Sequence, residues 1–277
     1  MKADIIWLAS IDSTNEEAKR RISDIDNLSV VSALEQTSGR GQRGNAWDST
    51  PGENLLFSIV LKSPSIKAEE HFALNEITAL SVIDFLSTYG VKAKIKWPND
   101  IYVGEKKICG ILIENSFLGR DISSSIIGIG LNINQRNFNV RLPNPTSLLL
   151  CRAQEEPLDI QRCLNGFMDI FTSYHDRFLT SDRDLSPLRQ RYLDTLWRSG
   201  KPSLFIDFTI LPTGRLDGPM NLFTPEPPDT DIPLQNQTGK VFPGIIRGLS
   251  ETGNLLVEDL STGLVRQFGF KEIGYIL

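Results

Sequence analysis

Residues 39–47, Gly-Arg-Gly-Gln-Arg-Gly-Asn-Ala-Trp, place three glycines among polar and basic side chains. Glycine allows positive φ angles and lets backbone N–H groups approach an anion closely, and arginine adds charge-assisted hydrogen bonds to phosphate or carboxylate. The segment lacks the Lys-Ser/Thr ending of a nucleoside-triphosphate P-loop, and its glycine spacing differs from the Rossmann fingerprint. We therefore predict a loop that holds an anion, with a plain flexible turn as the alternative.

A second cluster, Lys-Trp-Pro-Asn-Asp at residues 96–100, stands where a predicted strand ends and the chain must turn. Proline stiffens such a turn, while asparagine and aspartate can bond either the local backbone or a ligand. An Asx-type turn is the simpler interpretation, but the next predicted strand carries Lys106, Lys107 and Gly110. A half-buried lysine there could bridge a substrate carboxylate and a phosphate.

The third cluster, Gly-Ile-Gly-Leu-Asn-Ile-Asn at residues 128–134, ends another predicted strand. Glycine weakens a strand unless another group must come close to its backbone. A ligand is one such group, and a tightly packed helix is the other.

The elements that must position these clusters alternate between strand and helix. Capping side chains and acids at residues 12–17 predict a helix that ends near Ile22, and apolar residues at helical spacing predict others. The predicted strands are 5–8, 29–34, 55–61, 92–96, 106–114 and 125–133, and the further helices lie around 79–86, from 160 to 178 and over 185–197. This order predicts a mixed α and β domain over residues 1–199.

After the break at residues 199–202, Ser-Gly-Lys-Pro, the pattern becomes all-β. Runs at 203–210, 244–249, 255–258 and 264–268, with a hairpin turn at 251–254, predict a small barrel of about five strands in a second domain over residues 200–277. Residues 211–238 are rich in proline and polar residues and exceed an ordinary connection of roughly 2 to 6 residues, so we predict an exposed insertion.

Composition bounds the class of protein. The chain has 277 residues, a net charge of -5 and a pI near 5.2, which predicts no general affinity for nucleic acid. No signal peptide and no apolar run of about 20 residues is found, so we expect a cytoplasmic protein without a membrane span. Three widely spaced cysteines predict reduced, mostly buried thiols. Only two histidines are present, so any metal would arrive with a nucleotide.

In order and spacing these clusters, together with Ser13-Thr14-Asn15 and Gln36, resemble the biotin–protein ligase family, in its form without an N-terminal DNA-binding domain. The resemblance runs from about residue 5 to the end, since residues 242–276 look like the small carboxy-terminal domain of that family; residues 211–238 fall outside it. The resemblance implies an α+β fold, a mixed sheet flanked by helices in a class II synthetase-like biotin/lipoate ligase catalytic domain, with an SH3-like β-barrel at the carboxy terminus.

The resemblance also implies roles for individual residues. It makes Lys107 and Arg40 catalytic and assigns biotin binding to Ser13, Thr14, Asn15, Gln36, Arg40, Gly41, Gln42, Lys107 and Gly110. It assigns the nucleotide to Gly39, Arg43, Trp47, Lys96, Asn99 and Asn132, with no fixed protein site for a metal. Relatives usually carry basic residues where Gln42 and often Asn45 stand, so phosphate contacts from those two side chains are not expected here.

The activity implied is ATP- and Mg2+-dependent formation of biotinyl-5'-AMP, followed by transfer of biotin to a lysine of a biotin carboxyl carrier protein. A lipoate or octanoate ligase or transferase of the same fold is one alternative, and a non-catalytic ligand-binding module is another. Only 12 residues precede Ser13, so neither a DNA-binding domain nor a DNA partner is expected. Exposed sheet edges could pair two copies, which leaves a homodimer and a monomer both open.

Overall fold

The structure, a computed structural model, describes residues 4–42, 46–152, 156–179, 184–210 and 239–276. The chain divides into two compact units, residues 1–197 and 198–277, close to the boundary predicted at 199/200. The predicted insertion at 211–238 lies outside the described residues. In the described parts of the chain, no helix is long and apolar enough to cross a membrane.

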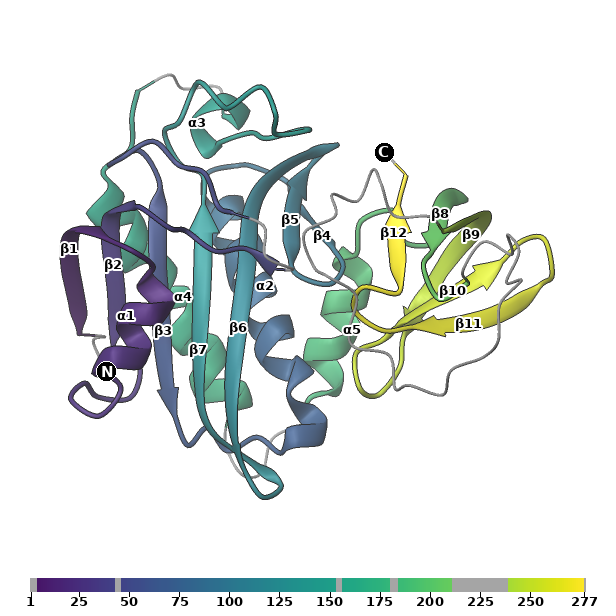
Figure 1. The fold of residues 1–277 in the computed structure, drawn as a ribbon, viewed down its shortest axis with the longest axis horizontal. Helices are drawn as coiled ribbons and strands as arrows, with labels where there is room; N and C mark the ends of the chain where they lie inside the picture. The colour runs from purple at the N-terminus through teal and green to yellow at the C-terminus, as the bar shows by residue number, and fades with distance from the viewer. Residues whose placement is uncertain (1–3, 43–45, 153–155, 180–183, 211–238, 277) are drawn as a thin grey trace, which may run out of the picture. The chain divides into compact units, whose positions relative to one another are not determined.

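The first unit is built on a seven-stranded sheet with the order β1-β2-β3-β7-β6-β5-β4 (Figure 1). The pair β1/β2 is parallel and all other neighbouring pairs are antiparallel. The strands are β1 (Ile5–Ile11), β2 (Val30–Gln36), β3 (Leu55–Lys62), β4 (Lys94–Lys96), β5 (Asp100–Val103), β6 (Lys106–Leu118) and β7 (Asp121–Leu131). All six predicted strands of this unit are confirmed. The short β5 was not predicted, because we interpreted its residues as part of the turn after residue 96.

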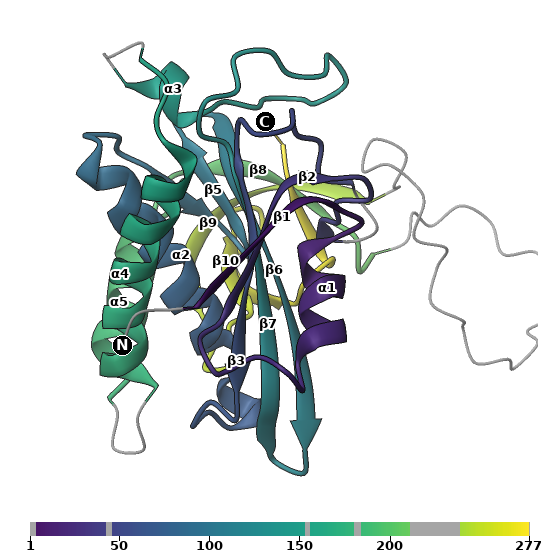
Figure 2. The same cartoon turned by 90° about the vertical axis from the view of Figure 1, so that its left-hand side faces the viewer.

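Helices cover both faces of this sheet. Figure 2 shows α1 on one face and α2, α4 and α5 on the other, and α2 packs against both α4 and α5. The helices are α1 (Thr14–Arg21), α2 (Phe72–Thr88), α3 (Leu148–Cys151), α4 (Ile160–Phe178) and α5 (Ser186–Thr195), with a 3-10 turn at Ala68–Glu70. Helix α1 ends one residue before Ile22, with acids in its first turn and cations in its last, as the helix dipole favours.

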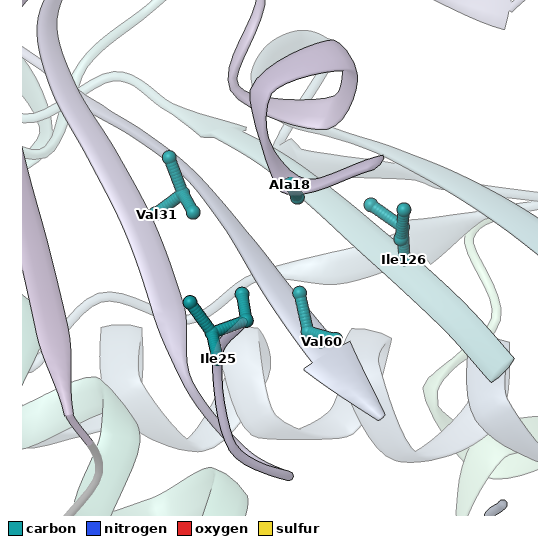
Figure 3. Close-up of a cluster of buried hydrophobic side chains, with 5 residues drawn as sticks. All are labelled: Ala18, Ile25, Val31, Val60 and Ile126. Carbon is teal, nitrogen blue, oxygen red and sulfur yellow. The ribbon is translucent and has the colours of Figure 1, made fainter. Parts of the chain in front are cut away.

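A small apolar cluster fixes α1 on the sheet. Ala18 and Ile25 pack against Val31, Val60 and Ile126, which come from β2, β3 and β7 (Figure 3). All five side chains are buried, and burial of apolar area is the main favourable term in such packing. This cluster holds the first turn of α1 at a set position over the strands.

The second unit contains a five-stranded antiparallel sheet with the order β11-β10-β9-β8-β12. Its strands are β8 (Ser203–Asp207), β9 (Lys240–Leu249), β10 (Leu255–Asp259), β11 (Leu264–Phe268) and β12 (Ile273–Tyr275). The predicted turn at 251–254 joins β9 to β10, and Gly253 has a φ of 87° there. The α+β class, with a mixed sheet flanked by helices and a small carboxy-terminal SH3-like unit, is confirmed.

Candidate functional site

One pocket in the first unit gathers most of the residues predicted for the site. It lies at the start of α1, beside the central strands β6 and β7, and it brings Arg40 and Lys107 to the same cavity. Its lining consists of Ser13, Thr14, Asn15, Gln36, Arg40, Gly41, Gln42, Trp47, Asn99, Lys107, Gly110, Ile111, Leu112, Gly128, Ile129 and Gly130. Two cations from distant parts of the sequence therefore face one cavity.

The first turn of α1 supplies a buried polar cluster. Ser13 is the residue before the helix, and the backbone N–H of Thr14 donates to Gln36 Oε1 over 2.7 Å. The hydroxyl of Thr14 lies 3.1 Å from the same oxygen and 2.8 Å from Ser58 Oγ. Gln36 ends β2, so a strand end and a helix start are held together at the pocket.

Lys107 and Asp100 form an ion pair of 2.7 Å on neighbouring strands of the sheet. The Lys107 side chain is 32% exposed. Burial by itself lowers the pKa of Lys107, but the adjacent carboxylate of Asp100 outweighs burial and raises that pKa above its ordinary value. Lys107 is therefore a cation throughout the physiological pH range.

Arg40 reaches the pocket from the glycine-rich loop. Its Nη1 donates to Glu16 Oε1 over 2.6 Å, and Glu16 also accepts from Lys19 over 2.9 Å. The hydrogen bond from Lys19 lowers the pKa of Glu16 despite some desolvation, so the carboxylate is ionised at neutral pH.

Bare glycine backbone forms part of the pocket wall. Gly110 and Gly130 are paired across β6 and β7, and the indole of Trp47 lies over both. A Cβ at Gly130 would lie 2.4 Å from Trp47 Cε2, and one at Gly110 would lie 2.9 Å from Trp47 Cζ3. The close approach predicted for residues 128–134 is found at Gly130 under Trp47 and at Gly128 under Asn15.

The loop carrying Trp47 closes on itself. The backbone N–H of Trp47 donates to Gly39 O over 2.9 Å, and Arg40 pairs with Ala46 in a short bridge. The Trp47 Nε1 atom is buried without a hydrogen-bond partner among the described residues. A buried indole N–H usually has a partner, so this donor is suited to an oxygen of a ligand.

Three predicted site residues do not line the pocket. Lys96 donates to Tyr102 Oη over 3.0 Å and lies over the Tyr102 ring. Asn132 is buried and donates to Thr146 O over 2.8 Å. Gly39 accepts a backbone hydrogen bond from Trp47, and Arg43 lies outside the described residues.

Sequence reasoning missed several residues that shape the site. Ser58 and Glu114 hold Asn15, and Glu16 holds Arg40. The cue for Glu16 was its place in the first turn of the helix that carries residues 13–15. Ser58 lies in a continuous apolar strand, and no local pattern marks it.

The cysteines are free and mostly buried, as predicted. Cys109 and Cys163 are buried and Cys151 is half-buried, all without disulfide bonds. Burial raises the pKa of the Cys109 thiol, which keeps it protonated. Among the residues that the structure describes, no group of three or more His, Cys, Asp or Glu side chains could hold a metal ion.

Comparisons with known proteins agree with the family resemblance found in the sequence. Residues 7–132 match the model of the Biotin/lipoate A/B protein ligase family. The chain is 31% identical over 156 residues to the bifunctional ligase/repressor BirA of Escherichia coli, covering 56% of this chain and 47% of that protein. It is 36% identical over 129 residues to the biotin–[acetyl-CoA-carboxylase] ligase of Paracoccus denitrificans, covering 46% and 53%. The chain spans about half the length of these curated relatives.

The fold is similar to that of the biotin protein ligase from Aquifex aeolicus solved with biotin and ATP. The TM-score is 0.73 at 24% identity, covering 98% of this chain and 97% of that one. This likeness concerns the fold, and the matched residues 7–132 contain all of the pocket lining. Residues 7–132 of this chain are therefore similar to the biotin/lipoate A/B protein ligase family, and the fold is similar to that of a biotin protein ligase.

Proposed function

We propose that this protein is a biotin–protein ligase that activates biotin with ATP to biotinyl-5'-AMP and transfers the biotinyl group to one lysine of a biotin carboxyl carrier protein. The observation that carries the proposal is the meeting of Arg40 and Lys107 in one pocket with Ser13, Thr14 and Gln36. Two cations beside buried hydrogen-bonding groups suit a ligand that has a polar ring at one end and an acid at the other.

The reaction needs no nucleophile from the protein. In the first half, an oxygen of the biotin carboxylate bonds to the α-phosphorus of ATP, and the bond to pyrophosphate breaks. In the second, the amine of the carrier lysine bonds to the acyl carbon and AMP leaves with the bonding electron pair, while the amine loses a proton. Neither His71 nor His175 lines the pocket, which suits this chemistry.

The chain would bring two anions together and stabilise the charge that develops as they react. Lys107 would contact the carboxylate and the α-phosphate, and Arg40 would fold over the phosphate from the loop. Fixed charges in a partly dehydrated site are the main source of such stabilisation. The hydrogen-bonding groups at the start of α1, with Gln36, Gly41, Gln42 and Gly110, would bind the ring end of biotin.

We assign the nucleotide side to Trp47 and Asn99, which line the pocket, and to Gly39, Arg43, Lys96 and Asn132. Among the residues that the structure describes, neither Trp47 Nε1 nor Asn132 Oδ1 has a hydrogen-bond partner, and such buried polar atoms fit a polar ligand. Magnesium, when bound, would neutralise phosphate charge. It prefers phosphate and water oxygens with one or two carboxylates, and Asp100 is the carboxylate paired with Lys107.

The decisive experiment is incubation of the protein with ATP, magnesium, biotin and a purified carrier domain, followed by mass spectrometry of the carrier. We expect a carrier that gains one biotinyl group in an ATP-dependent way. Parallel reactions with lipoate and octanoate test the alternative activity of the same fold. Transfer of those acids without transfer of biotin would refute the proposal, and so would an unmodified carrier in every reaction.

A further inference from the structure

Asn15 lies at the pocket, yet protein partners already use its hydrogen-bonding groups. The residue is 3% exposed. Its Nδ2 donates to Glu114 Oε2 over 2.7 Å and to Leu112 O over 3.4 Å, and its Oδ1 accepts from Ser58 Oγ over 2.6 Å. Both amide hydrogens and one oxygen lone pair are therefore engaged before any ligand binds.

Glu114 determines which way the Asn15 amide points. An ionised carboxylate only accepts hydrogen bonds, so a reversed amide would place Asn15 Oδ1 against Glu114 Oε2. The other carboxylate oxygen of Glu114 accepts from Lys19 Nζ over 2.7 Å. Because both oxygens of Glu114 have donors, the carboxylate is itself held in place.

The orientation of the Asn15 amide determines which hydrogen bonds Ser58 and Thr14 can form. Ser58 has a single hydroxyl hydrogen, and Asn15 Oδ1 can only accept, so that hydrogen belongs to the bond with Asn15. Ser58 therefore cannot donate across its 2.8 Å contact with Thr14, and Thr14 gives its own hydrogen to Gln36 Oε1, 3.1 Å away, or to Ser58. Thr14 Oγ1 is thereby left with a lone pair for an N–H group of a ligand.

The backbone beneath Asn15 keeps the amide from moving toward β7. A Cβ at Gly128 would lie 2.2 Å from Asn15 Oδ1, so the amide rests directly on the main chain of β7. Ser58 lies opposite Gly128 in the β3/β7 pairing. The amide is enclosed by Glu114, Ser58 and the glycine backbone.

We propose that Asn15 and Glu114 are paired positioning residues: the carboxylate of Glu114 sets the direction of the Asn15 amide, which through Ser58 sets the hydroxyl of Thr14 as a hydrogen-bond acceptor in the pocket. Asn15 itself donates no hydrogen bond to the ligand. The inference rests on the proposed function for the identity of the ligand, and it goes beyond that function by assigning Glu114 and by removing Asn15 from the groups that donate hydrogen bonds to the ligand.

An exchange of the two groups tests this geometry. In Asn15→Asp a carboxylate would face the Glu114 carboxylate, and in Glu114→Gln one oxygen would have to serve both Asn15 and Lys19. In the double variant N15D/E114Q, the new amide at position 114 donates to the new carboxylate at position 15 and accepts from Lys19. The bond from Ser58 is kept. The 3.4 Å contact with Leu112 O is lost, and the ion pair between Lys19 and Glu114 becomes a hydrogen bond to a neutral amide oxygen.

The double variant also keeps the net charge of the wild type, because the added carboxylate replaces the one removed. Asn165→Asp and Glu69→Gln, both exposed and on other elements, are the matched controls for the two single changes in charge.

The measurements are the biotin Kd by calorimetry and the free energy of unfolding in urea for all variants. We expect each single variant to raise Kd at least tenfold, the double variant to return within about threefold of the wild type, and both controls to match the wild type. A double variant as weak as the worse single variant would overturn the proposal, since Asn15 would then contact the ligand through its own N–H. Single variants that bind biotin as tightly as the wild type would also overturn the proposal.

Failure of the proposed function would look different. A wild type that binds no biotin refutes that function, and the pairing is then judged by the unfolding data alone. Recovery of stability in the double variant supports the paired geometry, whereas additive losses from the two substitutions overturn it.

Discussion

Arg40 Nη1 lies 2.6 Å from Glu16 Oε1, so the loop cation is bound to the helix whose first turn lines the same pocket. Arg40 is 57% exposed and Glu16 26%, and ion pairs of this exposure contribute only about 0.2–1 kcal/mol. The pair is therefore strong enough to orient Arg40 and weak enough for a phosphate to replace the carboxylate.

We predict that Glu16→Gln lowers the KM for ATP about two- to fivefold, because phosphate no longer has to displace a carboxylate from Arg40. The melting temperature should stay unchanged, because the lost energy is that of an exposed ion pair. Steady-state assays of pyrophosphate release measure this KM for ATP. Salt screens exposed charges, so the difference from the wild type should shrink at an ionic strength of about 0.5 M. Glu17→Gln is the control, since Glu17 pairs with Arg20 and Arg21; an equal effect on KM there would contradict a specific role for Glu16.

Replacement of Lys107 by alanine should leave biotin binding partly intact and slow adenylate formation by about 10²–10³-fold, as for the loss of one fixed charge at a reacting centre. Biotin-dependent pyrophosphate release reports the step. The neighbouring Lys106→Ala, at an exposed position, should behave as the wild type. Unchanged pyrophosphate release in Lys107→Ala would exclude the proposed role.

A methyl group on the glycine wall should block the pocket. We predict that Gly130→Ala raises the biotin KM at least tenfold, because its Cβ would lie 2.4 Å from Trp47 Cε2 and displace the indole. In the control Gly166→Ala, the nearest atom to the new Cβ is Phe85 Cε2 at 4.0 Å, and a helical alanine should raise stability by about 0.5–1 kcal/mol. Normal biotin kinetics in Gly130→Ala would show that this wall does not contact the ligand.

Glu76 should make stability depend on pH. The side chain is 0% exposed, and burial, opposed in part by Arg189, raises its pKa to about 7. The folded state then holds the proton more tightly than the unfolded chain does. This contribution is fully present below the unfolded pKa near 4.5, falls as the pH rises from there to about 7, and is absent above it.

Glu76→Gln is neutral at every pH, so we expect it to stabilise the protein relative to the wild type by more at pH 8 than at pH 5. Urea unfolding at both pH values gives the two differences. Glu69→Gln, at an exposed position, should show no such change between the two pH values. A difference for Glu76→Gln that is equal at pH 5 and pH 8 would mean that the carboxyl is already ionised throughout this range.

The sequence by itself determined the local elements and the segments that carry the chemistry. Apolar spacing placed every strand of the first unit except β5, and the glycine, lysine and asparagine clusters marked the loop, the turn and the strand end beside the pocket. These features depend on neighbours within a few residues, and such neighbours are visible in a linear pattern. The strand β5 was missed because its first residues were interpreted as part of the turn after residue 96, and β12 has only three residues.

Only the tertiary structure decided which polar groups meet. Glu114 is 99 residues from Asn15 and Ser58 is 43 residues from it, and their contacts exist because strand register sets three separate strands beside one helix. The same packing turned Lys96 toward Tyr102 and away from the pocket lining. Side-chain direction at a strand end depends on what packs above it, and that packing comes from residues distant in the sequence.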